Sequence, residues 1–368
     1  MRKYKLLLKT LSPLHIGGKE GAIPGSRYCN FGNKIHFLKE KSYLKMIMNR
    51  GLNKDSLYTI NNIKVNESDI AYSLRKGSEV INHGKIEIRQ FVRDVRYQPY
   101  IPGSSIKGAL RNAFLNQLIA ANPNALRKIE ESINKYIESG QKNRKLSRRA
   151  KVKSQNLENF IEDFLRSNFL SSKYSRANHQ NKDFFRTIRI SDSKPLDKNK
   201  PVYYYAKIYR HTEPNSMSPK GTLIFLEAIP KGITLEFELT FDETLFERFS
   251  QKPFTSPEEL IDMTKAFSTR VKKIETEYFQ RIPNAEKDNR FTERWENILE
   301  NGNLILGFGS GLLGSTLFSI LPEKLRKDIR NLFDDHNDLP APSSLRVIES
   351  DNKIIWPIGW CQISLEEI

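Results

Sequence analysis

The alternation of apolar and polar positions is clearest in the second half of the chain. Between residues 233 and 240, apolar side chains alternate with threonine and glutamate, which predicts a β-strand with one buried face. The turn sequence Pro-Lys-Gly at 230–232 precedes this segment, and an apolar run over 222–228 comes before the turn. We therefore predict a β-hairpin over residues 222–240.

Shorter apolar runs bounded by turn residues predict further strands. These lie at 4–10, 35–38, 185–191, 202–208, 345–349 and 358–365, the last two as a pair. Apolar residues at helical spacing predict helices over 103–121, 126–168, 256–271, 288–301 and 322–333. Prominent hairpins beside helices favour two small antiparallel α+β units over one doubly wound parallel sheet.

The pattern of the sequence changes around residues 198–201, and we predict a domain boundary there. Residues 1–200 would form an N-terminal domain, with insertions at about 42–95 and 122–184. Residues 201–368 would form the second domain, with its helices and a glycine-rich loop. The length of 368 residues is enough for two such domains.

The composition is strongly basic and favours a polyanionic partner. Lysine and arginine number 60, and the formal net charge is +17. Nucleic acid is the most common partner of such a protein, although a generally basic proteome would give the same surplus. The segment 141–155 is rich in basic residues and contains no acid, so it is either a nucleic-acid-binding arm or a solvated loop.

Several classes of protein are disfavoured by what the sequence lacks. Cys29 and Cys361 lie far apart without a CxxC pair, which argues against a zinc site and a disulfide framework and fits a cytoplasmic protein. The apolar runs are too short for a signal peptide or a membrane-spanning helix. We expect no cofactor, no metal and no membrane partner.

The stretch YIPGSSIKGALRNAF over 100–114 carries candidate chemistry. It is not a nucleotide P-loop, because Gly108 follows the lysine instead of preceding it. Ser104 or Ser105 is expected to cap a helix, and Lys107 and Arg111 share one helical face.

The charge at this helix start favours an external anion. A cation in the first turn opposes the helix dipole at a cost of about a few tenths of a kcal/mol, unless an anion binds there. The other interpretation is two solvated basic residues on an ordinary helix.

The glycine-rich loop GFGSGLLGS over 307–315 raises a similar question. Gly309, Gly311 and Gly314 match the spacing of a dinucleotide fingerprint, but too few residues follow them to build a Rossmann unit. The small residues suit close approach to a phosphate backbone, and a plain tight turn is the alternative.

Four stretches together resemble one family. They are SPLHIGG, IPGSSIKGALR, GFGSGLLGST and IWPIGWCQISL. The sequence resembles the RAMP proteins of type III-A CRISPR effector complexes, and within them the family of the fifth Csm subunit. The hairpin prediction and the stretch FRTIRISDS also fit this family, so the resemblance covers residues 5 to about 365.

The resemblance implies a fold of two ferredoxin-like (RRM-like) domains carrying helical and basic insertions. It implies a non-catalytic subunit that caps one end of the complex, binds the 3′ part of the crRNA and assists its maturation in antiviral defence. The implied partners are crRNA, the other subunits and host nucleases that trim the RNA. The residues expected to contact RNA are His15, Gly17, Gly18, Ser104, Ser105, Lys107, Arg111, Gly307, Gly309, Ser310, Gly311 and Gly314. The loop with the target-cleaving aspartate of the backbone subunits has no match, so we expect no target cleavage.

His15 keeps an enzymatic alternative open. Some RAMP proteins are repeat-processing endoribonucleases, and His15 could act as a metal-independent general base or acid, with Tyr28, His36 or Lys107 as candidate partners. The other interpretation is a histidine that orders its loop through hydrogen bonds. Asp192 is expected to be a turn or cap residue and not a metal ligand.

Overall fold

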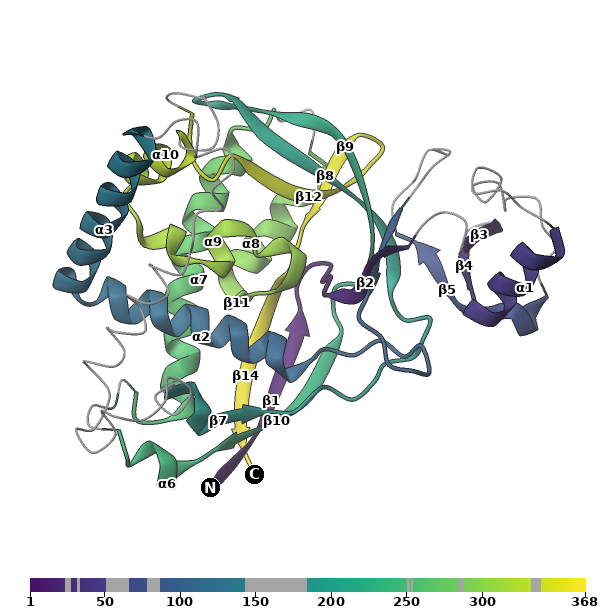
Figure 1. The fold of residues 1–368 in the computed structure, drawn as a ribbon, viewed down its shortest axis with the longest axis horizontal. Helices are drawn as coiled ribbons and strands as arrows, with labels where there is room; N and C mark the ends of the chain where they lie inside the picture. The colour runs from purple at the N-terminus through teal and green to yellow at the C-terminus, as the bar shows by residue number, and fades with distance from the viewer. Residues whose placement is uncertain are drawn as a thin grey trace.

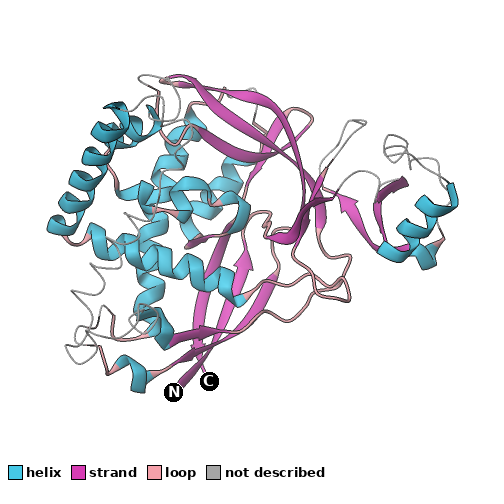
Figure 2. Cartoon of the chain, in the orientation of Figure 1, coloured by secondary structure: helices cyan, strands magenta, loops and turns pink. Residues whose placement is uncertain are grey.

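The computed structural model is mixed α/β in the residues that it describes (Figures 1 and 2). The described residues are 1–23, 28–31, 34–50, 66–77, 87–142, 184–249, 252, 254–283, 287–331 and 339–368. The predicted mixture of helices and strands is therefore confirmed. Most of the basic segment 141–155, and the later part of the helix predicted over 126–168, lie outside these residues.

Both ends of the chain lie at the centre of a five-stranded sheet. Its order is β11-β14-β1-β10-β7, and every neighbouring pair is antiparallel. The strands are β1 (Arg2–Thr10), β7 (Ile188–Ile190), β10 (Thr234–Phe241), β11 (Leu304–Ile305) and β14 (Trp360–Glu367). The sheet thus joins segments that are more than 300 residues apart.

Two helices cover one face of this sheet, namely α2 (Gly103–Ala120) and α7 (Pro257–Gln280) (Figure 1). Buried residues of β1 and α2, such as Leu6 and Leu110, belong to one hydrophobic core with Leu260 of α7. The chain order β1, α2, β7, β10, α7, β14 is a βαββαβ arrangement. This unit takes its strands from both sides of residues 198–201.

A larger sheet runs beside the first one and also combines both halves of the chain. Its path is β2-β6-β9-β8-β5-β4-β3, with β12 paired to β8 and β13 paired to β12. The strands are β2 (Gly17–Ile23), β3 (Tyr28–Phe31), β4 (Lys34–Leu38), β5 (Ile70–Lys76), β6 (Ile88–Phe91), β8 (Val202–Glu213), β9 (Ser216–Ala228), β12 (Ser344–Ser350) and β13 (Lys353–Pro357). The division into two ferredoxin-like domains is not confirmed and stays a prediction.

The remaining helices lie around the two sheets. They are α1 (Glu40–Arg50), α3 (Pro123–Lys142), α6 (Glu243–Phe246), α8 (Phe291–Asn301), α9 (Gly311–Ser315) and α10 (Glu323–Asn331). Strands β3, β4 and β5 and helix α1 form an arm that projects from the side of the body (Figure 1).

The predicted hairpin over 222–240 is wrong, although both of its strands exist. Strand β9 pairs with β8 and β6 in the larger sheet, whereas β10 pairs with β1 and β7 in the smaller one. The turn between them carries the chain from one sheet to the other. Gly232 has a φ of 88°, and its amide donates to the Thr10 carbonyl. The alternating pattern predicted the strand correctly but carried no information on its partner.

Two further predictions need correction. Residues 184–187 form a 3-10 turn, so only residues 188–190 of the strand predicted at 185–191 are extended. The C-terminal strand predicted at 358–365 is β14, which pairs with β1 and β11, while the partner of β12 is β13. Phe184 and Phe185 are buried aromatic residues in the core, which explains their apolar signal without a strand.

A buried ion pair connects the arm, the larger sheet and the first loop. The Glu227 carboxylate of β9 accepts from Arg93 Nε and Nη2, both at 3.1 Å, and from the Phe91 amide. The Tyr72 hydroxyl in the arm donates to the same carboxylate, and the Arg93 guanidinium lies 3.6 Å from the centre of the Tyr72 ring. Burial raises the pKa of Glu227, and Arg93 offsets part of that rise.

Replacing Arg93 with methionine is expected to destabilise the protein by about 3–5 kcal/mol, because Glu227 would remain as a buried charge without its cation. Urea unfolding of both proteins measures this difference. Arg2→Met is the matched control, since its pair with Glu243 is exposed, and it should change the stability little. Equal stabilities of Arg93→Met and the parent would contradict this role.

Candidate nucleic-acid interface

Three of the glycine-containing segments meet at one place, which we call the loop junction and define as residues 12–18, 306–314 and 357–360. The Gly359 amide donates to the Pro13 carbonyl at 2.9 Å, and the Leu306 amide donates to the Gly359 carbonyl at 2.9 Å. The Phe308 amide donates to the His15 carbonyl at 2.9 Å. Segments that are far apart in the sequence are thus joined by backbone hydrogen bonds.

Three glycines of the loop junction, Gly307, Gly309 and Gly359, allow backbones to cross closely. A Cβ at Gly307 would overlap the His15 carbonyl, and one at Gly309 would overlap the Ile358 carbonyl. Gly359 likewise lies against the Leu306 carbonyl, and Gly307 and Gly359 have φ angles of 68° and 85°. Gly311, with a φ of 52°, faces open space. Packing of the protein on itself therefore explains Gly307 and Gly309 without a ligand.

The other small residues of the two loops have individual roles. Gly314 is buried and packs against Ile305, and the Ser310 hydroxyl donates to the Gly307 carbonyl at 2.8 Å. Gly17 and Gly18 begin β2 and have only ordinary contact distances around them. The fingerprint interpretation of the glycine loop is excluded here, because β11 before it pairs antiparallel with β14.

His15 is a buried residue within the loop junction. Its Nδ1 lies 2.7 Å from the Glu227 carbonyl, and its ring meets Phe91 and Phe308 edge to face. Burial lowers the pKa of His15 to about 4, so the ring is neutral at physiological pH. A neutral ring with Nδ1 protonated can donate to this carbonyl, which is the loop-ordering role.

The candidate catalytic partners of His15 make their described contacts elsewhere. His36 Nδ1 contacts the Ser73 hydroxyl in the arm, and Tyr28 packs in the hydrophobic core of the arm. Lys107 Nζ donates to the Ile188 carbonyl at 2.8 Å, beside the smaller sheet. The structure therefore does not gather these groups around His15.

Two arginines that the sequence analysis missed flank the loop junction. The guanidinium carbons of Arg89 and Arg346 lie 5.1 Å and 4.5 Å from the centre of the Phe308 ring. Arg346 also donates to the Phe308 carbonyl at 2.8 Å, and Arg89 on β6 is exposed. Among the described residues neither arginine forms an ion pair. The aromatic residue inside the glycine loop was a usable sequence signal, but nothing in the sequence marked Arg346.

Helix α2 starts differently from the prediction. Its N-cap is Pro102, and the Asp192 carboxylate accepts from the Gly103 amide at 2.8 Å. Ser104 and Ser105 lie within the first turn instead, so neither caps the helix. Asp192 supplies the negative charge that this helix end prefers, which confirms its expected cap role. An external anion is therefore not needed to explain Lys107.

Helix α2 is nevertheless joined to the glycine loop. Asn112 Nδ2 donates to the Gly314 carbonyl at 3.0 Å, and Asn116 Nδ2 donates to the Thr316 carbonyl at 3.1 Å. Arg111 is half-buried beside Asn112, and Ser104 and Gly108 are exposed on the same helix. The structure thus brings α2 and the glycine loop together.

The open face of the smaller sheet carries paired charges. Lys3 lies 3.0 Å from Glu238, and Lys5 lies 2.9 Å from Glu236, each pair across β1 and β10. RRM domains bind RNA by stacking bases on aromatic residues of this face. The exposed outward positions on the described β1, β10 and β14 hold no aromatic residue, and Trp360 at the start of β14 is buried. These described positions therefore offer no stacking surface of the RRM kind.

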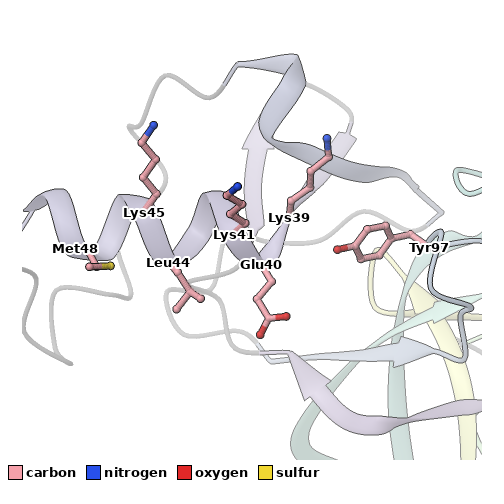
Figure 3. Close-up of a pocket in the computed structure, with 7 residues that line it drawn as sticks. All are labelled: Lys39, Glu40, Lys41, Leu44, Lys45, Met48 and Tyr97. Atoms are coloured by element: carbon pink, nitrogen blue, oxygen red, sulfur yellow. The ribbon is translucent and has the colours of Figure 1, made fainter.

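A hollow of about 800 Å³ lies on the arm, between α1 and Tyr97 (Figure 3). Lys39, Lys41 and Lys45 point to one side of it, while Leu44 points to the other. Its lysines would suit an anionic partner, and its exposed apolar residues would suit a protein. It is a second surface open for contacts.

No group of residues with metal-ligand character is found in the described part of the chain. The described helices also include none that is long and apolar enough to cross a membrane.

Comparisons with known proteins agree with the resemblance of the sequence motifs. A family model described as the RAMP superfamily matches residues 7–313. A protein of Streptococcus thermophilus named CRISPR system Cms protein Csm5 is 29% identical, and the match covers 65% of this chain. The match spans 64% of that relative's own length. A Methanocaldococcus jannaschii protein with the same name is 25% identical over 87% of this chain and 75% of its own length.

Solved structures share the fold over nearly the whole chain. One chain in a cryo-EM structure of a Csm–crRNA–target RNA ternary complex of a type III-A CRISPR-Cas system matches with a TM-score of 0.62 and 20% identity. That match covers 98% of this chain and 100% of the other. The crystal structure of T. onnurineus Csm5 matches with a TM-score of 0.59 and 21% identity, covering 97% and 99% of the two chains. These structures show a shared fold, and the family model confirms the family resemblance.

Two glycines of α2 should respond in opposite directions to alanine. A Cβ at Gly103 would overlap the Ile190 and Ser191 carbonyls, so Gly103→Ala should destabilise the protein by about 1–3 kcal/mol. Gly108 has open space around it, and Gly108→Ala should stabilise the helix by about 0.5–1 kcal/mol. Thermal unfolding of both variants measures this contrast, and a stable Gly103→Ala protein would disprove the close crossing.

The carboxyl group of Glu275 should make stability depend on pH. It is buried and accepts from Trp360 Nε1 at 3.0 Å, and burial raises its pKa to about 8. A folded-state pKa above the unfolded value holds the proton in the native state. The contribution of Glu275 to the free energy of unfolding is therefore fully present below the unfolded pKa of 4.5. It is lost as the pH rises toward about 8.

Glu275→Gln keeps an acceptor for Trp360 and removes the titration. The variant should gain stability over the parent by about 1.4 kcal/mol per pH unit through that window, and match it near pH 4.5. Urea unfolding at several pH values provides the measurement. A difference that does not change with pH would show that Glu275 is ionised in the native state.

Proposed function

This chain belongs to the RAMP superfamily, and we propose that, as the Csm5-type subunit of a type III-A CRISPR complex, it binds crRNA at the loop junction. Its relatives carry the Csm5 name, and a structural neighbour lies in a complex with crRNA and target RNA. In this proposal the chain binds the 3′ part of the guide without catalysis, as a cytoplasmic protein, and assists the maturation of that RNA.

The observation that supports this proposal is the pair of arginines at Phe308. Arg89 and Arg346 flank one aromatic ring, and among the described residues neither has a carboxylate partner. Burial and the charge of Arg89 lower the pKa of Arg346, which shows that the two cations repel each other. A phosphate group between or beside them would relieve this repulsion. Guanidinium planes also stack on unpaired bases.

Helix α2 would extend this surface. Ser104 and Gly108 are exposed, and Arg111 lies on the same helix as Asn112, which joins α2 to the glycine loop. The hydrogen bond of Lys107 to Ile188 leaves it a positive point charge near the RNA path. A sugar–phosphate backbone held in this way is positioned by contacts that do not themselves depend on the bases.

A non-catalytic role fits the environment of His15. Its Nδ1 is occupied by the Glu227 carbonyl, and its low pKa leaves little of the protonated form needed by a general acid. The metal-independent endoribonuclease with His15 as base or acid remains the alternative function. If the subunit is non-catalytic, as we propose, recruitment of host nucleases would explain how the RNA is trimmed.

Arg89→Glu is the test of the proposed surface. The variant should bind a labelled single-stranded RNA of guide length about tenfold more weakly than the parent. The slope of log affinity against log salt should fall by about 0.7 for each phosphate group that the variant no longer binds. Fluorescence anisotropy over a series of salt concentrations measures both quantities.

Arg248→Glu is the matched control, because Arg248 is an exposed residue next to α6 at the far end of the smaller sheet. This substitution changes the net charge by the same amount as Arg89→Glu and should reduce the affinity for RNA much less. Identical reductions in affinity for both variants would mean that only the overall charge matters. Cleavage of the RNA in EDTA that stops in His15→Ala would support the endoribonuclease instead.

A further inference from the structure

We propose that a cavity beneath the glycine loop receives one flipped-out pyrimidine base of the RNA bound at the loop junction. The cavity has a volume of about 170 Å³. Its lining includes Glu275, Tyr278, Gly309, Leu313, Ser343 and Arg346. The proposal deepens the proposed RNA-binding function and rests on it.

The size of the cavity favours a single six-membered ring. A cavity of about 150 Å³ in another protein accommodates benzene. Pockets for drug-sized molecules are larger, at about 300–1,000 Å³. The volume of about 170 Å³ therefore suits a pyrimidine and is small for the fused rings of a purine.

The lining of the cavity consists of buried side chains and glycine backbone. Tyr278 of α7 is 2% exposed, its hydroxyl donates to the Pro342 carbonyl at 3.0 Å, and His211 and Arg281 contact its ring, so it is a fixed part of the wall with a small surface toward the cavity. Leu313 is buried and adds an apolar surface, while Gly309 and Gly311 bring backbone without side chains. Aromatic and apolar walls of this kind hold extruded bases in nucleic-acid-binding proteins.

Polar groups of the cavity can bind the edge of a base. Glu275 uses Oε2 to accept from Trp360, and its Oε1 makes no hydrogen bond with any described residue. Its raised pKa keeps the carboxyl group protonated, so it presents both an O–H donor and an acceptor without a buried charge. The hydroxyls of Ser343 and Ser344 are likewise not engaged by described residues.

The position of Arg346 links the cavity to the RNA surface. Arg346 lines the cavity and also stacks on Phe308 of the loop junction. A phosphate bound near Arg346 would therefore place the adjacent base close to the opening. Gly311, which faces open space with a φ of 52°, leaves room for the ribose beside the loop.

The test compares oligouridine, oligocytidine and oligoadenosine of equal length, by anisotropy, on the full chain. The parent should bind the two pyrimidine oligomers about fivefold or more tightly than oligoadenosine, because a purine that does not fit the cavity loses the contacts of one bound base. Ser343→Leu fills the cavity and should remove this preference. Ser343→Ala leaves the space open and is the matched control, which should retain it.

Glu275→Gln is a second variant that keeps the cavity volume. It replaces the O–H donor by an amide and should change the relative affinity for oligouridine and oligocytidine, with oligoadenosine unaffected. Thermal unfolding confirms that each variant is folded before its binding is interpreted.

The outcomes separate this proposal from the one on which it rests. Absence of a pyrimidine preference in the parent, with Arg89→Glu still weakening RNA binding, would overturn the base cavity alone. Failure of the parent to bind any of the RNAs would overturn the proposed function itself. If Ser343→Leu prevents assembly with other Csm subunits but leaves the pyrimidine preference intact, the cavity receives a protein side chain and the base proposal is wrong.

Discussion

The buried contact between Glu227 and Arg93 is the constraint on which the arrangement of this molecule depends. A carboxylate without exposed surface is tolerated only when its charge is paired and its oxygens accept hydrogen bonds. Arg93, Tyr72 and the Phe91 amide satisfy the side chain, and the carbonyl of the same residue meets His15. One residue thereby fixes the arm, two strands of the larger sheet and the base of the loop junction relative to one another.

The loop junction depends on a second physical condition, which is the absence of side chains where backbones cross. Gly307, Gly309 and Gly359 each lie against a carbonyl oxygen of another segment. The glycines of the motifs that resemble the RAMP family therefore contribute to the packing of the protein itself. The groups that we propose to contact RNA are different residues, Arg89 and Arg346, whose guanidinium groups both lie near the Phe308 ring.

The distribution of charge distinguishes this chain from an ordinary RRM. Lys3 and Lys5 on the open sheet face are paired with glutamates across the strands, and the exposed described positions of this face hold no aromatic residue on which a base could stack. Arg89 and Arg346, which have no carboxylate partner among the described residues, lie instead beside Phe308 of the glycine loop. A surface of this kind favours contacts with a phosphate backbone over direct reading of bases.

Much of the local structure could be predicted from the sequence. The strand at β1, the helix after Pro102 and the half-buried pattern of β10 follow from apolar periodicity and turn residues. The pairing of strands could not be predicted, as the hairpin at 222–240 shows, because a turn looks the same whether the chain returns to its neighbour or enters another sheet. The role of Ser104 and Ser105 as caps was wrong for a similar reason, since the cap is Asp192, which is distant in sequence.

The sequence by itself determined the family, the basic charge and the segments that meet at the loop junction, because these are properties of local motifs and composition. Only the tertiary structure decided which glycines pack against backbone, which cations remain without counter-ions among the described residues, and that His15 is buried and neutral. These properties depend on residues brought together from distant parts of the chain. Desolvation and charge pairing act through space, so periodicity along the sequence does not reveal them.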